Sequence, residues 1–415
     1  MVLYARSLGA SATLLGLIAG MMPLLVIFQI PAASHIPRLG FRGFVYAGWG
    51  TRVLFIFAMA VIPLTGPILD QNNRLGLLLA LLFGFNLSRG ISSCAWLPWI
   101  TALIPSTLRG KYLARDAAVQ NLASFATFLI AAACLASRPG TWQFSGLFLF
   151  SAVTGAISLG FLKRMPDAPI PEEIQGGKAR VPWLAMARYA PFKKLLVTLS
   201  CWSIAYGGIA AFTVAFLKSE VGMSEGRILA VTSASFLGGL SSLWFLGSRL
   251  DRLGSKPVLA VCFIAWAWVM AGWVGISGGA VSASVPLVLL LQLLMGLLAA
   301  IVQMANTRLA MAVIPVMGRN HFFAIYSVVG NVTLGMAPIG WGIVIDLLGP
   351  SSRPFAGLSW TRFAVFFAGA GMVFLFAFFL SRRLSEPKAA SMEALLRDIL
   401  LQSPLRFWLR FWPRG

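Results

Sequence analysis

Long apolar runs, separated by short polar segments, make up most of the sequence. Eleven of these runs are long enough to cross a bilayer, since a membrane-spanning helix needs about 20 mostly apolar residues. They cover residues 11–34, 43–67, 76–104, 114–136, 142–163, 192–217, 227–249, 256–277, 284–313, 322–348 and 360–381. The pattern predicts an all-α polytopic membrane protein with two helical bundles.

A polar, proline-rich stretch from Arg164 to Pro191 divides the runs into five and six. We therefore predict an N-terminal helical bundle at 1–163, a linker at 164–191, a C-terminal six-helix bundle at 192–383 and a tail at 384–415. In the tail, apolar residues at helical spacing precede arginines that alternate with Phe and Trp. This composition predicts an amphipathic helix in the lipid headgroup layer, with a disordered tail as the alternative.

Composition agrees with this class and excludes several others. Hydrophobic residues make up 59% of the 415 and charged residues only 11%, whereas a soluble domain carries about 25% charged residues. The net charge of +21 does not indicate nucleic-acid binding, because the basic residues lie in short loops beside lipid. The four cysteines fall inside apolar runs without metal spacing, so we expect no disulfide, no metal and no cofactor.

The segment from Gly247 to Pro257 is a short charged turn between two membrane-length runs. Its pattern, G-x-x-x-D-R-x-G-x-K, resembles the loop signature of the major facilitator superfamily of transporters. The resemblance implies a cytoplasmic latch formed by Gly247, Asp251, Arg252 and Gly254. The corresponding loop of the first half keeps Arg38 and Gly40 but has Pro37 in place of the acid. A chance basic turn is the alternative interpretation of the segment.

The resemblance implies six helices in each half, so the first helix of the first half is expected to be missing from this chain. An internal repeat supports this numbering. Shifting the chain by about 210 positions places Ala102–Pro105 over Ala312–Pro315, Arg109 over Arg319 and Asn121 over Asn331. Two parallel halves related by an axis along the membrane normal give such a pattern.

Basic residues are distributed unevenly between the two sides of the membrane. Most of the 33 Lys and Arg residues lie in alternate loops that include the linker and the tail. The positive-inside rule therefore places the linker and the C-terminus in the cytoplasm of a cell with the protein in its inner membrane. We expect a monomer in the lipid bilayer with a small-molecule substrate and without nucleic acid.

Arg89 is the strongest candidate for a substrate contact. It lies near the middle of the run 76–104, where an ionisable side chain costs at least ~2.5–3.5 kcal/mol. The resemblance implies that this helix lines the central cavity. Asn86 and Trp96, near Arg89 on the same run, are further candidate substrate contacts. The alternatives are an arginine that locks helices together and a tryptophan that fills the core. Arg52 on the preceding run is expected to extend toward the inner surface.

The facing half offers Gln292, Gln303 and Asn306, which share one face of a predicted helix. Because amides without partners avoid lipid, we expect this face to look into the cavity, with Tyr206 adding an aromatic wall. Hydrogen bonds between helices are the alternative role for the amides.

These features predict a secondary active or facilitative transporter, with efflux as one direction. The alternative is a non-transporting protein of the same fold, such as a receptor, a scaffold or a defunct carrier. No carboxylate lies at the centre of a run, and Asp346 is expected to be a helix-end partner. We do not expect an enzyme, because the two histidines lie on the side opposite the G-x-S-x-G sequence at 275–279.

Overall fold

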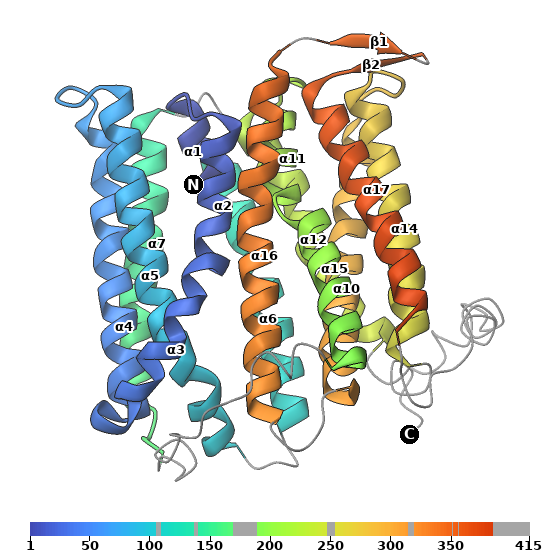
Figure 1. The fold of residues 1–415 in the computed structure, drawn as a ribbon. Helices are drawn as coiled ribbons and strands as arrows, with labels where there is room; N and C mark the ends of the chain where they lie inside the picture. The colour runs from blue at the N-terminus through green and yellow to red at the C-terminus, as the bar shows by residue number, and fades with distance from the viewer. Residues whose placement is uncertain are drawn as a thin grey trace, which may run out of the picture.

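The computed structural model describes residues 1–104, 109–136, 140–168, 189–246, 254–313, 319–350, 352–355 and 357–384. In chain order the elements are α1 (Val2–Ser7), α2 (Ala12–Leu25), the 3-10 helix η1 (Val26–Phe28), α3 (Gln29–Ala32), η2 (Ala33–His35), α4 (Ile36–Val61), η3 (Ile62–Thr65), α5 (Gln71–Leu103), α6 (Arg109–Cys134), α7 (Thr141–Arg164), α10 (Ala190–Tyr206), α11 (Ile209–Ser219), α12 (Glu225–Leu246), α14 (Ser255–Ser277), α15 (Val285–Val313), α16 (Arg319–Leu348), β1 (Arg353–Phe355), β2 (Leu358–Trp360) and α17 (Arg362–Arg382). The two strands form a small antiparallel hairpin at one end of the bundle (Figure 1).

The predicted helices are present, but two of them are broken. The first run forms α2, two short 3-10 helices and α3 instead of one continuous helix. The run predicted at 192–217 is split into α10 and α11 at Gly208, which has a φ of 84°. A side chain at Gly208 would also meet the ring of Phe212 and the Cβ of Pro338, so glycine is required twice over.

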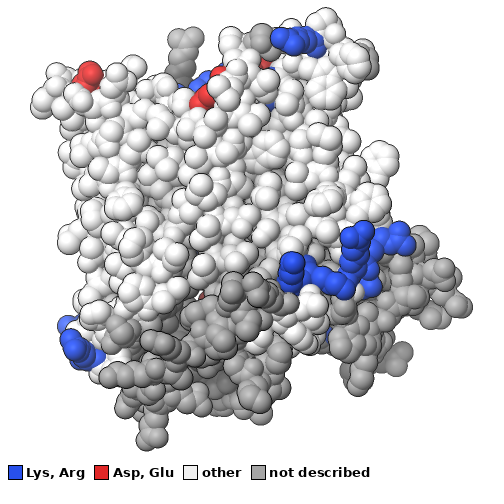
Figure 2. Space-filling view, viewed as in Figure 1, with Lys and Arg blue, Asp and Glu red and all other residues white. Residues whose placement is uncertain are grey.

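Ten helices in the described part of the chain are long and apolar enough to cross a membrane. The remaining predicted run, at 227–249, forms α12, which is not among those ten. On the face shown in Figure 2, a broad middle band carries no Lys, Arg, Asp or Glu, and charged side chains gather toward the two ends. This arrangement is that of a multi-pass membrane protein. The predicted linker at 164–191 and tail at 384–415 lie largely outside the described residues.

Matching backbone features support a repeat of the two halves. Gly9 and Gly222 both have positive φ, of 85° and 72°, and each is followed two residues later by a serine that directly precedes the next helix. Gly40 (φ 73°, ψ 161°) and Gly254 (φ 82°, ψ 160°) have almost the same conformation. These pairs are about 213 positions apart, close to the shift that aligns the sequence halves.

The halves meet mainly along two helix pairs, α2 with α16 and α6 with α12. A Cβ on Gly16 would lie 2.1 Å from the carbonyl oxygen of Pro338, and one on Gly20 would lie 2.2 Å from that of Gly335. Both contacts lie in the part of α2 near the hairpin end, whereas α3 packs on α5 instead. In Figure 1 the lower part of this segment leans away from α16. The halves are therefore joined most closely at the hairpin end.

The second half is packed more completely than the first. There α10 covers one face of α16: Leu199 lies against Gly330, and the Trp341 indole donates a hydrogen bond of 2.8 Å to the carbonyl oxygen of Ile204. In the repeat, Gly330 and Ala337 correspond to Gln120 and Thr127 of α6, and both of the latter are exposed. Within the described residues, α6 packs extensively on α12 alone. The first half thus has no described counterpart of α10.

Candidate functional site

Arg89 projects from the middle part of α5 and is exposed. It makes no hydrogen bond, ion pair or ring contact with any described residue. Asn86, one turn earlier, is buried and donates a hydrogen bond of 2.9 Å to the carbonyl oxygen of Leu82 on its own helix. Asn86 therefore uses an amide hydrogen within α5, whereas the guanidinium of Arg89 is not engaged by a described residue.

Arg52 lies near Arg89 where α4 packs on α5. Its guanidinium stacks on Trp49, one turn nearer the end opposite the hairpin, at 4.2 Å from the ring centroid, and faces Phe85 at 5.3 Å from the ring centroid. Its Nε is buried and has no hydrogen-bond partner. Arg89 lies one helical turn beyond Phe85 on α5, so the two arginines come from adjoining turns of α4 and α5. The Arg52 side chain thus extends in the predicted direction, but aromatic rings on α4 and α5 hold its guanidinium between the helices.

Close packing between α4 and α5 fixes the position of these two arginines. Ser88 donates a hydrogen bond of 3.0 Å to the carbonyl oxygen of Gly48, and a Cβ on Gly48 would lie 2.3 Å from that of Ser92. The Trp49 indole donates a hydrogen bond of 2.9 Å to the hydroxyl of Ser158 on α7. Small residues and interhelical hydrogen bonds thus set a close and rigid seam.

The three amides of α15 do not share one environment, which corrects the sequence prediction. Gln292 and Asn306 are 2% and 1% exposed, whereas Gln303 is exposed. Both polar side-chain atoms of Asn306 lack a partner. Helical spacing identified a common face, but neighbouring helices cover the two ends of that face and leave Gln303 open.

The aromatic candidates pack within the two halves. Tyr206 stacks on Trp202 with ring centroids 4.7 Å apart, and Trp266 and Phe374 complete this cluster within the second half. Trp96 contacts Trp99, whose indole donates a hydrogen bond of 3.1 Å to the carbonyl oxygen of Pro166. Core packing, the alternative interpretation, therefore accounts for the Tyr206 ring and for much of Trp96.

Only part of the predicted latch can be located. Gly247, Asp251 and Arg252 lie outside the described residues, while Gly254 directly precedes α14 and Arg38 is exposed on α4. Sequence reasoning missed Asp167, which accepts a hydrogen bond of 3.2 Å from the backbone N–H of Arg42 just after Gly40. A carboxylate from beyond α7 thus lies beside Gly40, in the first-half loop that has Pro37 instead of an acid.

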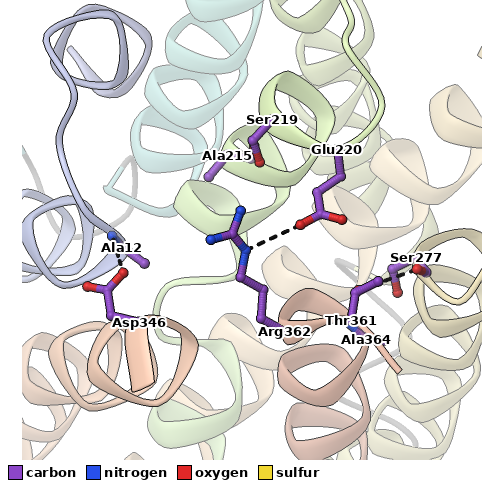
Figure 3. A network of polar contacts seen from close by, with 9 residues as sticks. All are labelled: Ala12, Ala215, Ser219, Glu220, Ser277, Asp346, Thr361, Arg362 and Ala364. Carbon is purple, nitrogen blue, oxygen red and sulfur yellow. Dashed lines mark hydrogen bonds and ion pairs between the residues drawn. The ribbon is translucent and has the colours of Figure 1, made fainter. Parts of the chain in front are cut away.

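Asp346 joins the halves at the hairpin end (Figure 3). Its carboxylate oxygens accept hydrogen bonds from the backbone N–H groups of Ala12 (2.9 Å) and Thr13 (2.7 Å), the first residues of α2. Nearby, Arg362 pairs with Glu220 at 3.2 Å within the second half. Asp346 is therefore a helix-end partner, as predicted, and it caps a helix of the opposite half.

Replacing Asp346 with alanine is expected to cost about 1 kcal/mol of stability because the N–H groups of Ala12 and Thr13 lose their acceptor. It should also increase the labelling of a cysteine introduced at Ile339, which faces Gly16, in a protein without its native cysteines. Asp70→Ala is the matched control, since Asp70 caps α5 within one half. Labelling that rises equally in both variants would contradict a specific role for Asp346 between the halves.

A cavity of about 610 Å³ also lies at the hairpin end, between α1, α5, α7 and the α11–α12 connection. Its lining includes Tyr4, Arg74 and the ion pair between Lys218 and Glu225. Burial raises the pKa of the Tyr4 phenol, and the nearby charge of Arg74 opposes that rise. None of the predicted site residues lines this cavity.

Comparison with known proteins gives a likeness of structure alone. No family model matches the sequence, and no curated protein matches it. The structure is similar to that of a D-xylose–proton symporter, with a TM-score of 0.71 and 14% identity over 90% of this chain and 88% of the other. A mutant of the nucleoside transporter NupG matches with a TM-score of 0.68 and 14% identity, over 91% of this chain and 92% of the other.

A bacterial homologue of the iron transporter ferroportin, in an inward-facing state, gives a TM-score of 0.63 and 15% identity over 92% and 93% of the two chains. These proteins share little sequence with this chain but cover nearly all of it. The chain therefore has the all-helical, multi-pass membrane fold of these transporters, the major facilitator fold.

Proposed function

We propose that this protein is a membrane transporter that moves a small organic solute by alternating access. The observation that carries the proposal is the way the halves meet, through two main helix pairs with the closest approach of α2 to α16 near the hairpin end. Two rigid bundles joined in this way can rock about a site at mid-depth. Arg89 is the proposed solute contact, because its guanidinium lies at that depth without a partner.

The proposed orientation follows from the basic loops. The linker, the tail and the latch loop carry an excess of Lys and Arg, which favours the cytoplasm for the end opposite the hairpin. The hairpin end would then face outward, and closure there by α2 and α16 would correspond to an inward-facing arrangement.

The test is a flux screen in proteoliposomes with labelled sugars, nucleosides, amino acids and organic acids. Wild-type protein should take up at least one solute faster than protein-free liposomes, and Arg89→Ala should lower that rate at least about tenfold, as expected for a lost charged contact. Arg42→Ala, an exposed arginine at the start of α4, is the control. A folded protein that moves no solute in the panel would favour the second candidate.

The second candidate is a non-transporting protein, and the open face of α6 favours it. In the second half α10 packs on α16 and α17, whereas the corresponding face of α6 bears the exposed Gln120 and Thr127. If the first half lacked this helix, no protein wall would close one side of a central cavity. A receptor or scaffold would not need that wall.

We also propose that a helix equivalent to α10 and α11 fills this face of α6 in the working protein and continues into α1. The glycine and serine that follow α1 match those that follow α11, so α1 corresponds to the last turns of such a helix. The reading frame upstream of Met1 should then encode about 20 apolar residues. Frames without such a run would contradict a first helix carried by this polypeptide.

A further inference from the structure

The pair of arginines at mid-depth suggests which solutes the site accepts. Arg52 lies midway along the Ile36–Thr65 span, and Arg89 lies about one helical turn past the middle of Gln71–Ile100. Both guanidiniums are thus far from either membrane surface. A charged group at this depth is stable only when a partner, water or a ligand compensates its desolvation.

The described residues of the first half supply no carboxylate to this pair. Asp70 caps the start of α5, Asp116 accepts a hydrogen bond from Gln120 near the start of α6, and Asp167 caps the segment after Gly40. All three lie toward the ends of their helices and are already engaged. Within this part of the chain, Arg52 and Arg89 therefore lie close to one another without a carboxylate counter-ion.

The two guanidiniums differ in a way that suits a binding site. Arg52 is held in place by stacking on Trp49, and that ring is itself fixed by the hydroxyl of Ser158. Its buried Nε remains without a partner. Arg89 is exposed and makes no hydrogen bond, ion pair or ring contact with any described residue. One arginine is preorganised and the other is free to close on a ligand.

We infer that Arg52 and Arg89 together form an oxyanion site, so that the transported solute is an organic acid whose carboxylate, sulfonate or phosphonate lies between the two guanidiniums. Guanidinium groups bind oxyanions through paired N–H donors, and two of them offer more donors than a single anion needs. The anion would remove the repulsion between the two cations. This inference rests on the proposed transport function and names its substrate class.

The test measures thermal unfolding of the purified full chain in neutral detergent at constant ionic strength. Benzoate, phenylphosphonate and sulfate are the oxyanion probes, and benzamide is the neutral analogue of benzoate. At least one oxyanion should raise the Tm of the wild type by about 2 °C or more, and benzamide should not. Arg52→Gln and Arg89→Gln should each abolish that rise, whereas Arg42→Gln should keep it.

Arg52→Lys and Arg89→Lys guard against a loss caused by misfolding, because they keep the charge but lose the planar fork. Each should fold and bind the anion at least about tenfold more weakly than wild type. No Tm rise with any oxyanion, or a rise that survives either glutamine substitution, would overturn the inference. Transport of neutral solutes without oxyanion binding would contradict the anion site and support the transport function. Oxyanion binding without any flux would support the anion site and contradict the transport function.

Discussion

Replacing Gly16 with leucine is expected to separate α2 from α16 and to abolish transport. A Cβ at this position would lie 2.1 Å from the carbonyl oxygen and 2.7 Å from the carbonyl carbon of Pro338. These are backbone atoms of α16, so the neighbour cannot turn aside as a flexible side chain would. Overpacking of this kind costs about 3 kcal/mol, and here the whole cost falls on the contact between the halves.

The measurement combines solute flux with labelling of a cysteine at Ile339, in a protein without its native cysteines. Gly16→Leu should label faster than the wild type and lose most of its flux, while each half stays folded. Gly340→Leu, on the partner helix α16, is the control for an added side chain, because a Cβ there meets nothing within 4 Å. Normal labelling and flux in Gly16→Leu would show that the halves do not need this close approach.

Much of the fold could be predicted from the sequence because bilayer crossing imposes long apolar runs. The breaks within those runs could not be predicted from the sequence. A Gly207–Gly208 pair inside an apolar run is compatible with a continuous helix, and the close approach of Ala337 on α16, whose Cβ would lie 2.6 Å from a Cβ at Gly207, is seen only in the structure. Local pattern does not contain that contact, which joins residues far apart in the chain.

The candidate site shows the same limit. Depth along a run singles out Arg89, since depth follows from sequence position. The contacts that hold Arg52 between the helices depend on Trp49 beside it and on Phe85 from the next helix, and sequence position alone does not predict them. Asp167 was missed because the N–H that it binds, at Arg42, belongs to a helix 125 residues away.

Replacing Gly296 with alanine is expected to lower the stability of the second half. An added Cβ would lie 1.8 Å from the carbonyl oxygen of Ser235, and the reciprocal position, Gly238, would meet that of Leu293 at 2.0 Å. These glycines let α12 and α15 approach within one bundle, so the clash cannot be relieved by rocking of the halves. A cost of about 3 kcal/mol is a large share of the stability of a domain.

Thermal unfolding in detergent should therefore show a Tm about 6 °C or more below that of the wild type for Gly296→Ala. Gly275→Ala is the control within the same half, because its Cβ would make only an ordinary contact of 3.6 Å with Val281. The contrast with Gly16 distinguishes two kinds of close contact. Substitution at Gly16 should open the hairpin end of folded halves, whereas substitution at Gly296 should lower the stability of one half. A Gly296→Ala protein with the Tm of the wild type would mean that α12 and α15 do not pack through their glycines.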